Sequence, residues 1–383
     1  MINFTNEQRM IQKAIRELAK NKIEPLTKEA DIEGHSSPAI INLLSEIDLL
    51  SMALPEKYGG INANYTTIAM AVEEIARVDA STAMILFVTQ SLIQILKQWG
   101  NEEQKERFFM KMSTGDKVNA FSLTEPDFGS ESAAIQTKAV LDGNHYIING
   151  TKIFVTNGDI ADYVLVFVRT GDEKKHKGLS ALIVEKDKTP GFRIGKHENK
   201  MGLRGSDLSE LIFENARVHK DNLLGNPGSG WDILMTGGAD MRAYGPGAMA
   251  VGLARGALEF ASDYAKQRIQ FGRPISDFQA IRFMLADMSI QVDAARALLY
   301  RTTAYMDAGS GEKRLRSRLG SSTKCFASDV AMRVTTDAVQ ILGGYGVMKD
   351  FPVERMMRDA KMIQIFDGSN QIQRIIVANS LLS

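Results

Sequence analysis

A single carboxylate interrupts an apolar run in the stretch Ile363-Gln364-Ile365-Phe366-Asp367-Gly368-Ser369-Asn370-Gln371-Ile372-Gln373. Gly and Ser follow the carboxylate at once, and a helical apolar pattern then resumes, which Ser369 or Asn370 could cap. Burial in apolar surroundings raises the pKa of a carboxyl group, and the positive end of a helix beside it partly stabilises its charged form. Asp367 is therefore a candidate general base. The alternative is an ordinary turn before a helix, where Asp, Gly and Ser are common.

The whole chain has the composition of an ordinary globular protein. Its 383 residues suffice for roughly two or three domains, its formal net charge is zero, and 44% of its residues are hydrophobic. No basic stripe or acidic tail indicates binding to nucleic acid or to a membrane surface, and we see no apolar run close to the ~20 residues of a membrane span. The only cysteine, Cys325, excludes an internal disulfide framework, and we interpret it as a small buried residue. The chain begins with a helix signal rather than a targeting peptide, so we expect a cytoplasmic protein.

Common metal and nucleotide motifs are missing from the sequence. The histidines are scattered without the paired spacing of a metal site, so we expect no metal; they are His35, His145, His176, His197 and His219. There is no nucleophile elbow and no P-loop, and the glycines of residues 225–230 have the wrong order for a dinucleotide fingerprint. A nucleotide cofactor would therefore be held by something other than a Rossmann unit.

The first part of the chain, residues 1–118, is predicted to be helical throughout. Thr5 and Gln8 form a capping box for the first helix, which we expect to end at Pro25. Two apolar helices follow within residues 66–99. The second of these has apolar residues nearly all round, so we expect it to be buried and to form part of the floor of a pocket.

The hydrophobic pattern then changes to the alternation of strands. Residues 141–145 are typical of a hairpin turn, and short segments rich in branched and aromatic residues occur at 163–168, 180–184 and 211–213. The helical pattern returns after Gly230 and continues to the end, with a break near residues 309–311.

This order predicts an α+β protein that is mostly α, and no alternation of strands and helices supports a parallel sheet. The predicted domains are an N-terminal helical domain of residues 1–118, a middle β domain of residues 119–227 and a C-terminal helical domain of residues 228–383.

Five stretches carry a family signature in order and cover essentially the whole chain. They are residues 120–131 (AFSLTEPDFGSE), 149–158 (NGTKIFVTNG), 200–206 (KMGLRGS), 264–275 (YAKQRIQFGRPI) with Gln279 just beyond, and 340–346 (QILGGYG) together with the opening stretch. In combination they resemble the FAD-dependent acyl-CoA dehydrogenases. The resemblance implies an N-terminal helical domain, a middle β-barrel-like domain and a C-terminal four-helix bundle. It also implies a homotetramer with FAD held between the β domain and the bundle.

The resemblance assigns roles by match of position. The base would be Asp367. The flavin ring would be lined by Phe121, Leu123, Thr124, Phe154 and Thr156. The FAD of a neighbouring subunit would be reached by Arg268, Gln270, Phe271, Gln279, Gln340 and Gly344. Ser369 and Gln371 would hold the cofactor beside the base. The substrate would be bound by Ser130, at its CoA portion, and by Arg242 and Gly368.

Each of these residues also has an ordinary structural interpretation when it is taken alone. Phe121, Leu123 and Phe154 could be strand residues that face a core, and Arg268 could be a solvated helix charge. The glycines of residues 343–346 could form a simple turn. The flavin site accounts for all of them together.

The resemblance implies that Asp367 removes the α-proton of an acyl-CoA thioester. The backbone N–H of the same residue and a ribityl hydroxyl of FAD would bind the thioester oxygen, because removal of this weakly acidic proton requires a base and a stabilised enolate. Hydride would pass from the β-carbon to the flavin, and an electron-transfer flavoprotein would reoxidise the flavin. The product would be an α,β-unsaturated acyl-CoA.

The sequence departs from the family at the base. Most members carry Glu in an I-Y-E-G-T context, whereas here Phe366 precedes Asp367 and Ser369 follows Gly368. Asp is one methylene shorter, which moves the carboxylate back by ~1–1.5 Å. Some members place the base just before an arginine on the first C-terminal helix, but here Met241 holds that place. Asp240 nearby is a poor candidate, because a helix turns it about 200° from Arg242.

We hypothesise that the shortened base makes room for a branched or cyclic acyl group, since Phe366 and Phe154 stand where the family has Tyr and Trp. The alternative enzyme function is a flavin oxidase of a small carbon acid such as a nitroalkane, because such oxidases in the same superfamily carry Asp at the base. A helical scaffold that has lost chemistry is a third possibility, which the residues Asp367, Arg268 and Thr156 oppose.

Overall fold

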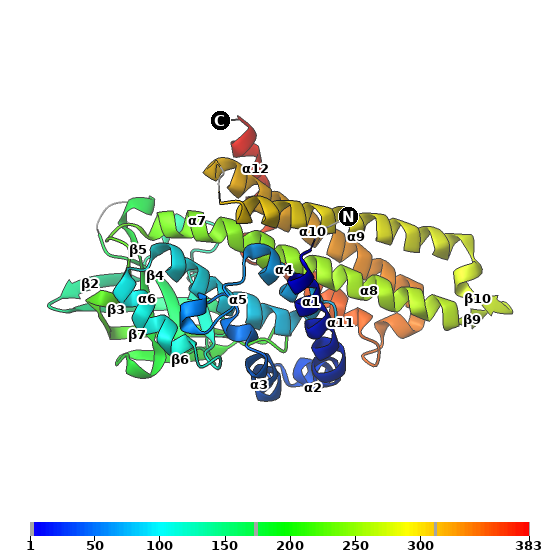
Figure 1. Ribbon diagram of the computed structural model, residues 1–383, viewed down its shortest axis with the longest axis horizontal. Helices are drawn as coiled ribbons and strands as arrows, with labels where there is room; N and C mark the ends of the chain where they lie inside the picture. The colour runs from blue at the N-terminus through cyan, green and yellow to red at the C-terminus, as the bar shows by residue number, and fades with distance from the viewer. Residues whose placement is uncertain (1–3, 172–174, 310–311, 383) are drawn as a thin grey trace.

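Helices form both ends of the chain and a sheet forms its middle in the computed structural model, which describes residues 4–171, 175–309 and 312–382. The strands of the large sheet lie at the left of Figure 1, the N-terminal helices lie near the centre, and three long helices extend to the right, where β9 (Ile269–Gln270) and β10 (Arg273–Pro274) form a small separate hairpin. The predicted order of helices, strands and helices is confirmed.

The N-terminal part is helical, as predicted. Its helices are α1 (Asn6–Leu18), the π-helix η1 (Ala19–Ile23), α2 (Glu24–Glu33), α3 (Pro38–Glu46), α4 (Tyr65–Ala76), α5 (Ala80–Trp99) and α6 (Glu102–Met112). The capping box of Thr5 and Gln8 is present. The expectation that Pro25 ends the first helix is wrong. Pro25 lies in the first turn of α2, where a missing N–H costs no hydrogen bond, and the π-turn carries the chain on to Glu33.

Helix α5 is the core helix of this region, which confirms that it is buried. With 20 residues and a mean hydropathy of 1.3, α5 could cross a membrane by length and composition alone. The expectation that no apolar run approaches the length of a membrane span is therefore wrong. However, 94% of this apolar window is buried inside the protein. Its polar residues bind the backbone of neighbouring segments. Gln90, for example, donates hydrogen bonds of 3.0 Å to the carbonyls of Leu49 and Leu50.

The described strands form an eight-stranded sheet in the order β6-β7-β3-β2-β4-β5-β8, with β1 beside β4. The strands are β1 (Asn119–Ser122), β2 (Lys138–Asp142), β3 (His145–Thr156), β4 (Tyr163–Arg169), β5 (Leu179–Glu185), β6 (Phe192–His197), β7 (Leu208–His219) and β8 (Leu223–Leu224). The predicted hairpin joins β2 and β3 through a two-residue loop. Most pairs are antiparallel, but β1 and β2 each pair with β4 in parallel, which the order of the elements did not indicate.

The sheet is buried on both faces, which explains the unbroken apolar run of β4. Leu165 and Phe167 belong to the large core shared with the helices. Val164, Val166 and Val168 point the other way, into a second core that also contains residues of β2, β3, β5 and β7. A sheet that encloses its own core in this manner matches the predicted barrel-like domain.

The C-terminal part is helical. Its elements are α7 (Gly230–Arg242), the π-helix η8 (Ala243–Gly247), α8 (Ala248–Gln267), β9 (Ile269–Gln270), β10 (Arg273–Pro274), α9 (Gln279–Asp307), α10 (Lys313–Leu342), the 3-10 helix η10 (Gly343–Val347), α11 (Val353–Ile363) and α12 (Asn370–Leu382). Helix α10 packs against α8, α9 and α11, and α8 packs against α9 and α11, which gives a four-helix bundle.

The break that we predict near residues 309–311 falls between α9 and α10, and residues 310–311 lie outside the described residues. The element type changes between Met112 and Asn119 and again between Leu224 and Gly230. The domain boundaries at 118/119 and 227/228 stay predictions.

Candidate active site

Asp367 lies in the turn between α11 and α12. Its φ is 53° and that of Gly368 is 85°, so two consecutive residues adopt the left-handed conformation, which is strained for a residue with a side chain. Ser369 caps α12, because its Oγ accepts a hydrogen bond of 3.4 Å from the N–H of Ile372. The predicted helix start is confirmed, and the strained residue is the candidate base itself.

Buried side chains hold this turn in place. The Gln373 side-chain amide donates hydrogen bonds to the carbonyls of Asp367, at 3.0 Å, and Gly368, at 2.9 Å. Lys324, on α10, donates to the Gly368 carbonyl at 2.9 Å and to Asn370 Oδ1 at 2.8 Å. Because both donors are fully buried, the turn cannot relax without the loss of buried hydrogen bonds.

The positive charge of Lys324 also acts on the Asp367 carboxylate. Although the Asp367 side chain is exposed, the protein packed around it partly desolvates the carboxylate. This burial raises the pKa of Asp367 to about 6, against the positive charges of Lys324 and Arg242, which lower it. Burial lowers the pKa of Lys324 to about 8, and the charge of Asp367 opposes that shift. The result is a carboxylate that is ionised at neutral pH and binds a proton more readily than an ordinary Asp.

Asp367 offers two groups to a ligand. Within the described residues its carboxylate makes no hydrogen bond. Its backbone N–H lies outside any helix and likewise donates to none of the described residues. A proton acceptor and a free N–H on one residue can serve both needs of enolate formation, which are removal of the proton and stabilisation of the oxygen.

Arg242 lies at the end of α7, immediately before the π-helix η8. Burial lowers the pKa of Arg242 to about 10, and the charges of Asp367 and Asp240 oppose that shift. Within the described residues Arg242 donates one long hydrogen bond, of 3.3 Å from Nη1 to Ser321 Oγ, which leaves most of its donors open. Asp240 is engaged elsewhere, since it accepts a hydrogen bond of 2.7 Å from Arg316. This pairing agrees with our rejection of Asp240 as the base.

The β domain contributes a partly exposed surface beside the same core. Phe121 lies on β1, and Leu123 and Thr124 follow it directly. Phe154 sits at a bulge of β3 with a φ of 56°, and its side chain is 56% exposed. Thr156 ends the strand. Phe121 and Leu123 pack against the large core, and so does Phe366 beside Asp367.

A buried ion pair fixes the loop that follows β1. Lys152, on β3, lies 2.8 Å from Glu125 and donates a hydrogen bond of 2.9 Å to the carbonyl of Leu123. Glu125 also accepts hydrogen bonds from the backbone N–H groups of Gln136 and Thr137. Burial lowers the pKa of Lys152 to about 8, against the charge of Glu125. The pair therefore ties the loop of Leu123 and Thr124 to the strand of Phe154 and Thr156.

This surface suits a flavin ring. The exposed ring of Phe154 is an apolar platform, and the hydroxyls of Thr124 and Thr156 make no hydrogen bond within the described residues. Open hydroxyls and backbone amides are the groups that bind the polar edge of a flavin. The residues present therefore fit FAD.

A second group of predicted cofactor residues lies at the far end of the bundle. Arg268 sits over the ring of Tyr345 at 5.4 Å, and Phe271 is 92% exposed at the tip between β9 and β10. The remaining members of this group are all exposed and are Gln270, Gln279, Gln340 and Gly344. The tip lies at the right-hand end of Figure 1, whereas the sheet lies at the left. One chain does not bring this group to Asp367.

Other predicted residues lie at the surface. Ser130 is exposed in the loop after β1, and Gln371 is exposed in the first turn of α12. Cys325 is buried, as we interpreted it.

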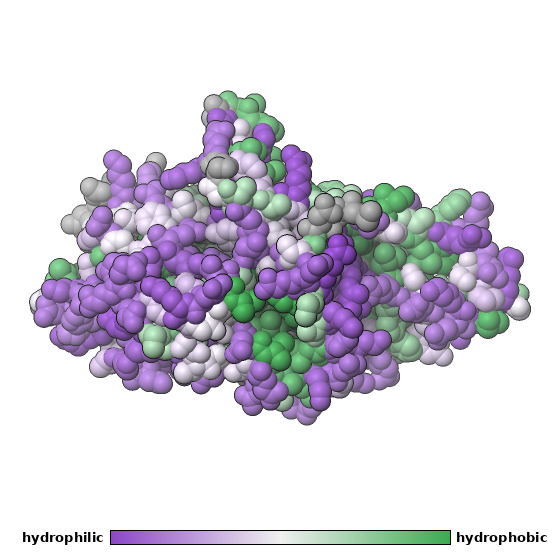
Figure 2. Space-filling view, in the orientation of Figure 1, coloured by the Kyte–Doolittle hydropathy of each residue, from purple (hydrophilic) through white to green (hydrophobic). Residues whose placement is uncertain are grey.

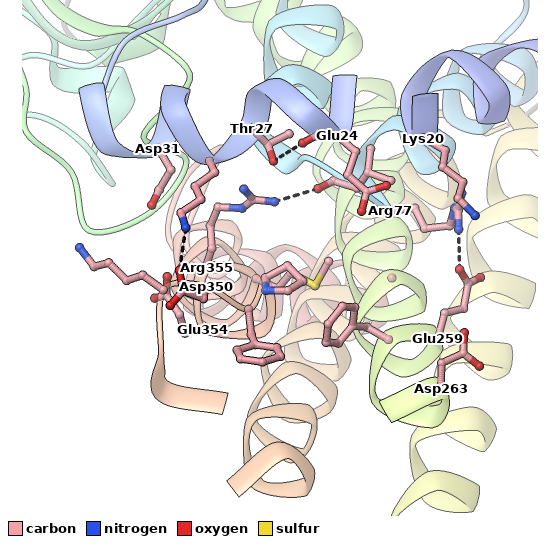
Figure 3. A pocket seen from close by; sticks show the side chains of 18 of the residues that line it. Lys20, Glu24, Thr27, Asp31, Arg77, Glu259, Asp263, Asp350, Glu354 and Arg355 are labelled. Atoms are coloured by element: carbon pink, nitrogen blue, oxygen red, sulfur yellow. Dashed lines mark hydrogen bonds and ion pairs between the residues drawn. The ribbon is translucent and has the colours of Figure 1, made fainter. Parts of the chain in front are cut away.

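A cavity lined by charged residues lies away from these residues. It measures about 560 Å³ between α2, α8 and α11, and Figure 3 shows charged side chains around it, such as Glu24, Asp31 and Arg77. Several of these charges are already paired, including Arg77 with Glu259. Neither Asp367 nor Phe154 lines this cavity.

Sequence reasoning missed three parts of the site, namely Lys324, Gln373 and the Lys152–Glu125 pair. A signal for Lys324 was present, because it falls in the buried stripe of α10 between Gly320 and Ala327, where a lone lysine is costly unless it has partners. Tyr244, on η8, was also missed. It is fully buried, and its hydroxyl makes no hydrogen bond within the described residues.

The chain matches the three domains of one family. The acyl-CoA dehydrogenase N-terminal domain matches residues 5–116, the middle domain matches residues 120–216, and the C-terminal domain matches residues 228–382.

Individual relatives and solved structures are similar over their full length. An acyl-CoA dehydrogenase of Bacillus subtilis is 42% identical over 382 residues, which cover 100% of this chain and 99% of the relative. A cyclohex-1-ene-1-carbonyl-CoA dehydrogenase of Geobacter metallireducens is 42% identical over 384 residues, with 100% of both chains covered. Butyryl-CoA dehydrogenase of Megasphaera elsdenii superposes with a TM-score of 0.95 at 40% identity and 100% coverage of both chains. A chain in the structure of an electron transferring flavoprotein of Acidaminococcus fermentans gives a TM-score of 0.96 at 43% identity, covering 100% of this chain and 99% of that one.

These matches support the dehydrogenase over the nitroalkane oxidase that the Asp at position 367 left open. The chain belongs to the acyl-CoA dehydrogenase family and is an FAD-dependent enzyme that oxidises acyl-CoA thioesters.

Proposed function

We propose that Asp367 is the catalytic base and that the substrate is a cyclic or α-branched acyl-CoA. The observation that carries this proposal is the state of Asp367 itself. Its carboxylate and its N–H are both free of hydrogen bonds within the described residues, burial raises the pKa of the carboxyl group to about 6, and the turn is held rigidly.

In this proposal Asp367 takes the α-proton of the thioester while its backbone N–H donates a hydrogen bond to the thioester oxygen. Arg242, whose charge lies near the carboxylate, keeps the base ionised before the reaction and binds the substrate together with Gly368. FAD, when bound, supplies the hydride acceptor. Ser130 would contact the CoA portion of the substrate from the loop after β1.

The cofactor contacts are proposed as the sequence suggests them. Phe121, Leu123, Thr124, Phe154 and Thr156 would line the flavin ring, and Ser369 and Gln371 would hold FAD beside the base. The exposed group at the tip would reach the FAD of a neighbouring subunit; it consists of Arg268, Gln270, Phe271, Gln279, Gln340 and Gly344. An arginine suits the diphosphate, because its fork of donors matches paired oxygens.

The proposed substrate class follows from the size of the base. The Asp367 carboxylate stands ~1–1.5 Å closer to the backbone than the carboxylate of a Glu would, which leaves room for a substituent at the α-carbon. A similar relative is named for a cyclic substrate, cyclohex-1-ene-1-carbonyl-CoA. Butyryl-CoA dehydrogenase is equally similar in fold, so the choice between classes rests on the experiment.

The experiment is anaerobic titration of the FAD-loaded protein with straight, branched and cyclic acyl-CoA thioesters, followed by bleaching of the flavin. We expect cyclic or α-branched thioesters to bleach the flavin faster than butyryl-CoA. Asp367→Glu should reverse this order, because the longer side chain fills the added space and reaches a straight chain.

The control is Asp263→Asn, an exposed carboxylate of α8 that should leave the order unchanged. If the Asp367→Glu variant keeps the chain preference of the original protein, the substrate proposal is wrong, and the assignment of the base remains to be judged by Asp367→Asn.

We further propose a homotetramer that passes electrons to an electron-transfer flavoprotein in the cytoplasm. The exposed tip residues support the assembly, since Figure 2 shows hydrophobic colour over α9 and the tip, where Phe271, Phe283 and Ile290 are exposed. The similar chain in the electron transferring flavoprotein structure supports the electron partner. The cytoplasmic location is supported by the single cysteine.

A further inference from the structure

Two histidines that are far apart in the sequence meet where the N-terminal helices join the β domain. His35 follows α2, and His197 ends β6, and their rings lie 4.1 Å apart between centroids with a tilt of 31°. Asp159, after β3, and Asp207, before β7, complete the cluster. One potential ligand atom from each of these four side chains lies within 4.8 Å of all the others.

Both ring nitrogens of His197 face hydrogen-bond acceptors. Its Nε2 lies 3.1 Å from the carbonyl of Gly34, which can only accept, so Nε2 carries a proton. Its Nδ1 lies 2.8 Å from Asp159 Oδ2, which is also an acceptor. A positive centre is therefore needed between Nδ1 and the carboxylate, which either a second ring proton or a metal ion supplies. A ring N–H bound to a backbone carbonyl, with the other nitrogen aimed at carboxylates, is the usual arrangement of a metal-bound histidine.

The carboxylates around His197 agree with this interpretation. Asp159 Oδ1 is buried and has no hydrogen-bond partner among the described residues. Asp207 is 3% exposed, and its Oδ1 lies 3.3 Å from His35 Nδ1 and 3.8 Å from His197 Nδ1. The two carboxylates together would balance the charge of a divalent ion.

The nearby cations hydrogen-bond to backbone carbonyls rather than to the carboxylates, although the charge of Lys200 also acts on Asp207 and Asp159. Lys200 donates to the carbonyl of Ser206 at 2.7 Å, and burial lowers the pKa of Lys200 to about 8. Arg204 donates to the carbonyls of Asp31, at 2.6 Å, and Ile32. Within the described residues, neither Lys200 nor Arg204 donates a hydrogen bond to Asp159 or Asp207.

We propose a Zn²⁺ site at this junction, with the ligands His35, Asp159, His197 and Asp207. Two imidazoles and two carboxylates suit zinc, whereas Mg²⁺ and Ca²⁺ prefer oxygen ligands alone. Tetrahedral zinc places its ligand atoms about 3.3–3.6 Å apart, so the contacts of 2.8, 3.3 and 3.8 Å are close to what the ion needs. The longer separations close by movement of His35, whose side chain is 59% exposed. A cavity of about 180 Å³ beside both histidines gives the ion an entrance.

The ion would join two parts of the protein. Its ligands come from the loop after α2 and from three segments of the β domain. One of these ligands, Asp159, lies three residues after Thr156, which ends β3. A bound Zn²⁺ would therefore stabilise the end of β3 against the N-terminal helices, because a ligand that binds only the folded chain raises its stability.

The test uses the full-length, FAD-loaded protein without a polyhistidine tag. It is stripped with a chelator, dialysed to equilibrium against ZnCl2, and its zinc is measured by plasma mass spectrometry. We expect about one Zn²⁺ per chain and a rise in Tm of about 2–5 °C on adding zinc. Both effects should be lost in His197→Ala and in the isosteric variant Asp159→Asn.

The matched control is His145→Ala. His145 also pairs with a second histidine, His219, at 5.3 Å between ring centroids, and His219 also has a carboxylate beside it, that of Asp221. This variant should keep its zinc. If His197→Ala does not fold, His35→Ala replaces it, because its side chain is largely exposed. A protein that retains no zinc, or variants of the cluster that retain as much as the original chain, would overturn the proposal.

Discussion

At the scale of single residues, the turn at Asp367 combines strain with restraint. A left-handed residue that carries a side chain costs of order 1–3 kcal/mol, and the hydrogen bonds from Lys324 and Gln373 hold it there. The backbone conformation in turn aims the carboxylate and the N–H of one residue at the same region. A short side chain on a rigid turn has few rotamers, so the backbone sets the position of the Asp367 carboxylate.

Asp367→Asn should lower the rate of flavin bleaching by acyl-CoA about 10²–10⁴-fold, because an amide cannot accept the proton. The variant should keep its FAD, since the amide has nearly the same shape and the turn is held by backbone carbonyls. Stopped-flow absorbance at 450 nm measures the bleaching rate, and the ratio of flavin to protein absorbance measures the FAD content. A variant that bleaches at an unchanged rate would remove Asp367 from the mechanism.

The pH dependence follows from the raised pKa of Asp367. A base works only in its ionised form, so kcat/KM should fall as the pH drops through about 6 and should reach its plateau above that value. Asp263→Asn should show the same profile. An acid limb near the pKa of an ordinary Asp, about 3.9, would mean that the surroundings do not perturb this carboxylate.

The turn that holds the candidate base could be predicted from the sequence, but its support could not. Asp367 is marked by its place in an apolar run before a helix. Lys324 lies 43 positions earlier on another helix, and only the packing of α10 against the turn shows that its ammonium reaches Gly368. Local patterns do not encode such distant contacts. The same is true of His35 and His197, which the sequence left scattered and the fold brings together.

At the scale of elements, the β domain holds its flavin-facing edges by charge as well as by strand pairing. Lys152 crosses from β3 to the loop after β1, where it meets Glu125 in a buried pair. A strand of alternating residues could be predicted, and so could the β2–β3 hairpin. The parallel pairing of β1 with β4 could not, because strand partners depend on tertiary packing rather than on chain order.

Lys152→Met should destabilise the protein by about 3–5 kcal/mol, because it leaves the charge of Glu125 buried without a partner. The comparison is Lys196→Met, which removes an exposed ion pair with Glu198 and should cost less than about 1 kcal/mol. Urea unfolding of the FAD-loaded variants measures both. Equal midpoints for the two variants would show that the buried pair contributes little.

At the scale of the whole molecule, the proposed cofactor residues fall into two groups at opposite ends of one chain. The residues of the β domain form one group, at the left of Figure 1, and Arg268 and Phe271 at the tip form the other, at the right. The order of helical and strand regions could be predicted from the hydrophobic period, and the proposed homotetramer comes from the family resemblance alone.

Co-expression of two inactive chains tests the sharing of sites between subunits. Asp367→Asn lacks the base, and Arg268→Ala should lose FAD affinity. If Arg268 serves the site of the neighbouring subunit, a site in a mixed assembly can combine an intact Asp367 from one chain with an intact Arg268 from the other. Random pairing of the two chains makes about one quarter of all sites of this kind. Acyl-CoA-dependent bleaching should then reappear in the mixture. A mixture as inactive as its parents, despite proven hybrid assemblies, would place Arg268 outside the neighbour's site.

Helix α5 carries a consequence for how the chain is made in the cell. Its partners include α7 and α8, which the ribosome completes more than a hundred residues later. Until they are made, part of this 20-residue apolar helix stays uncovered, and exposed apolar surface of this kind makes an incomplete chain prone to aggregate. A chain that ended before α7 would therefore depend on chaperones to stay in solution.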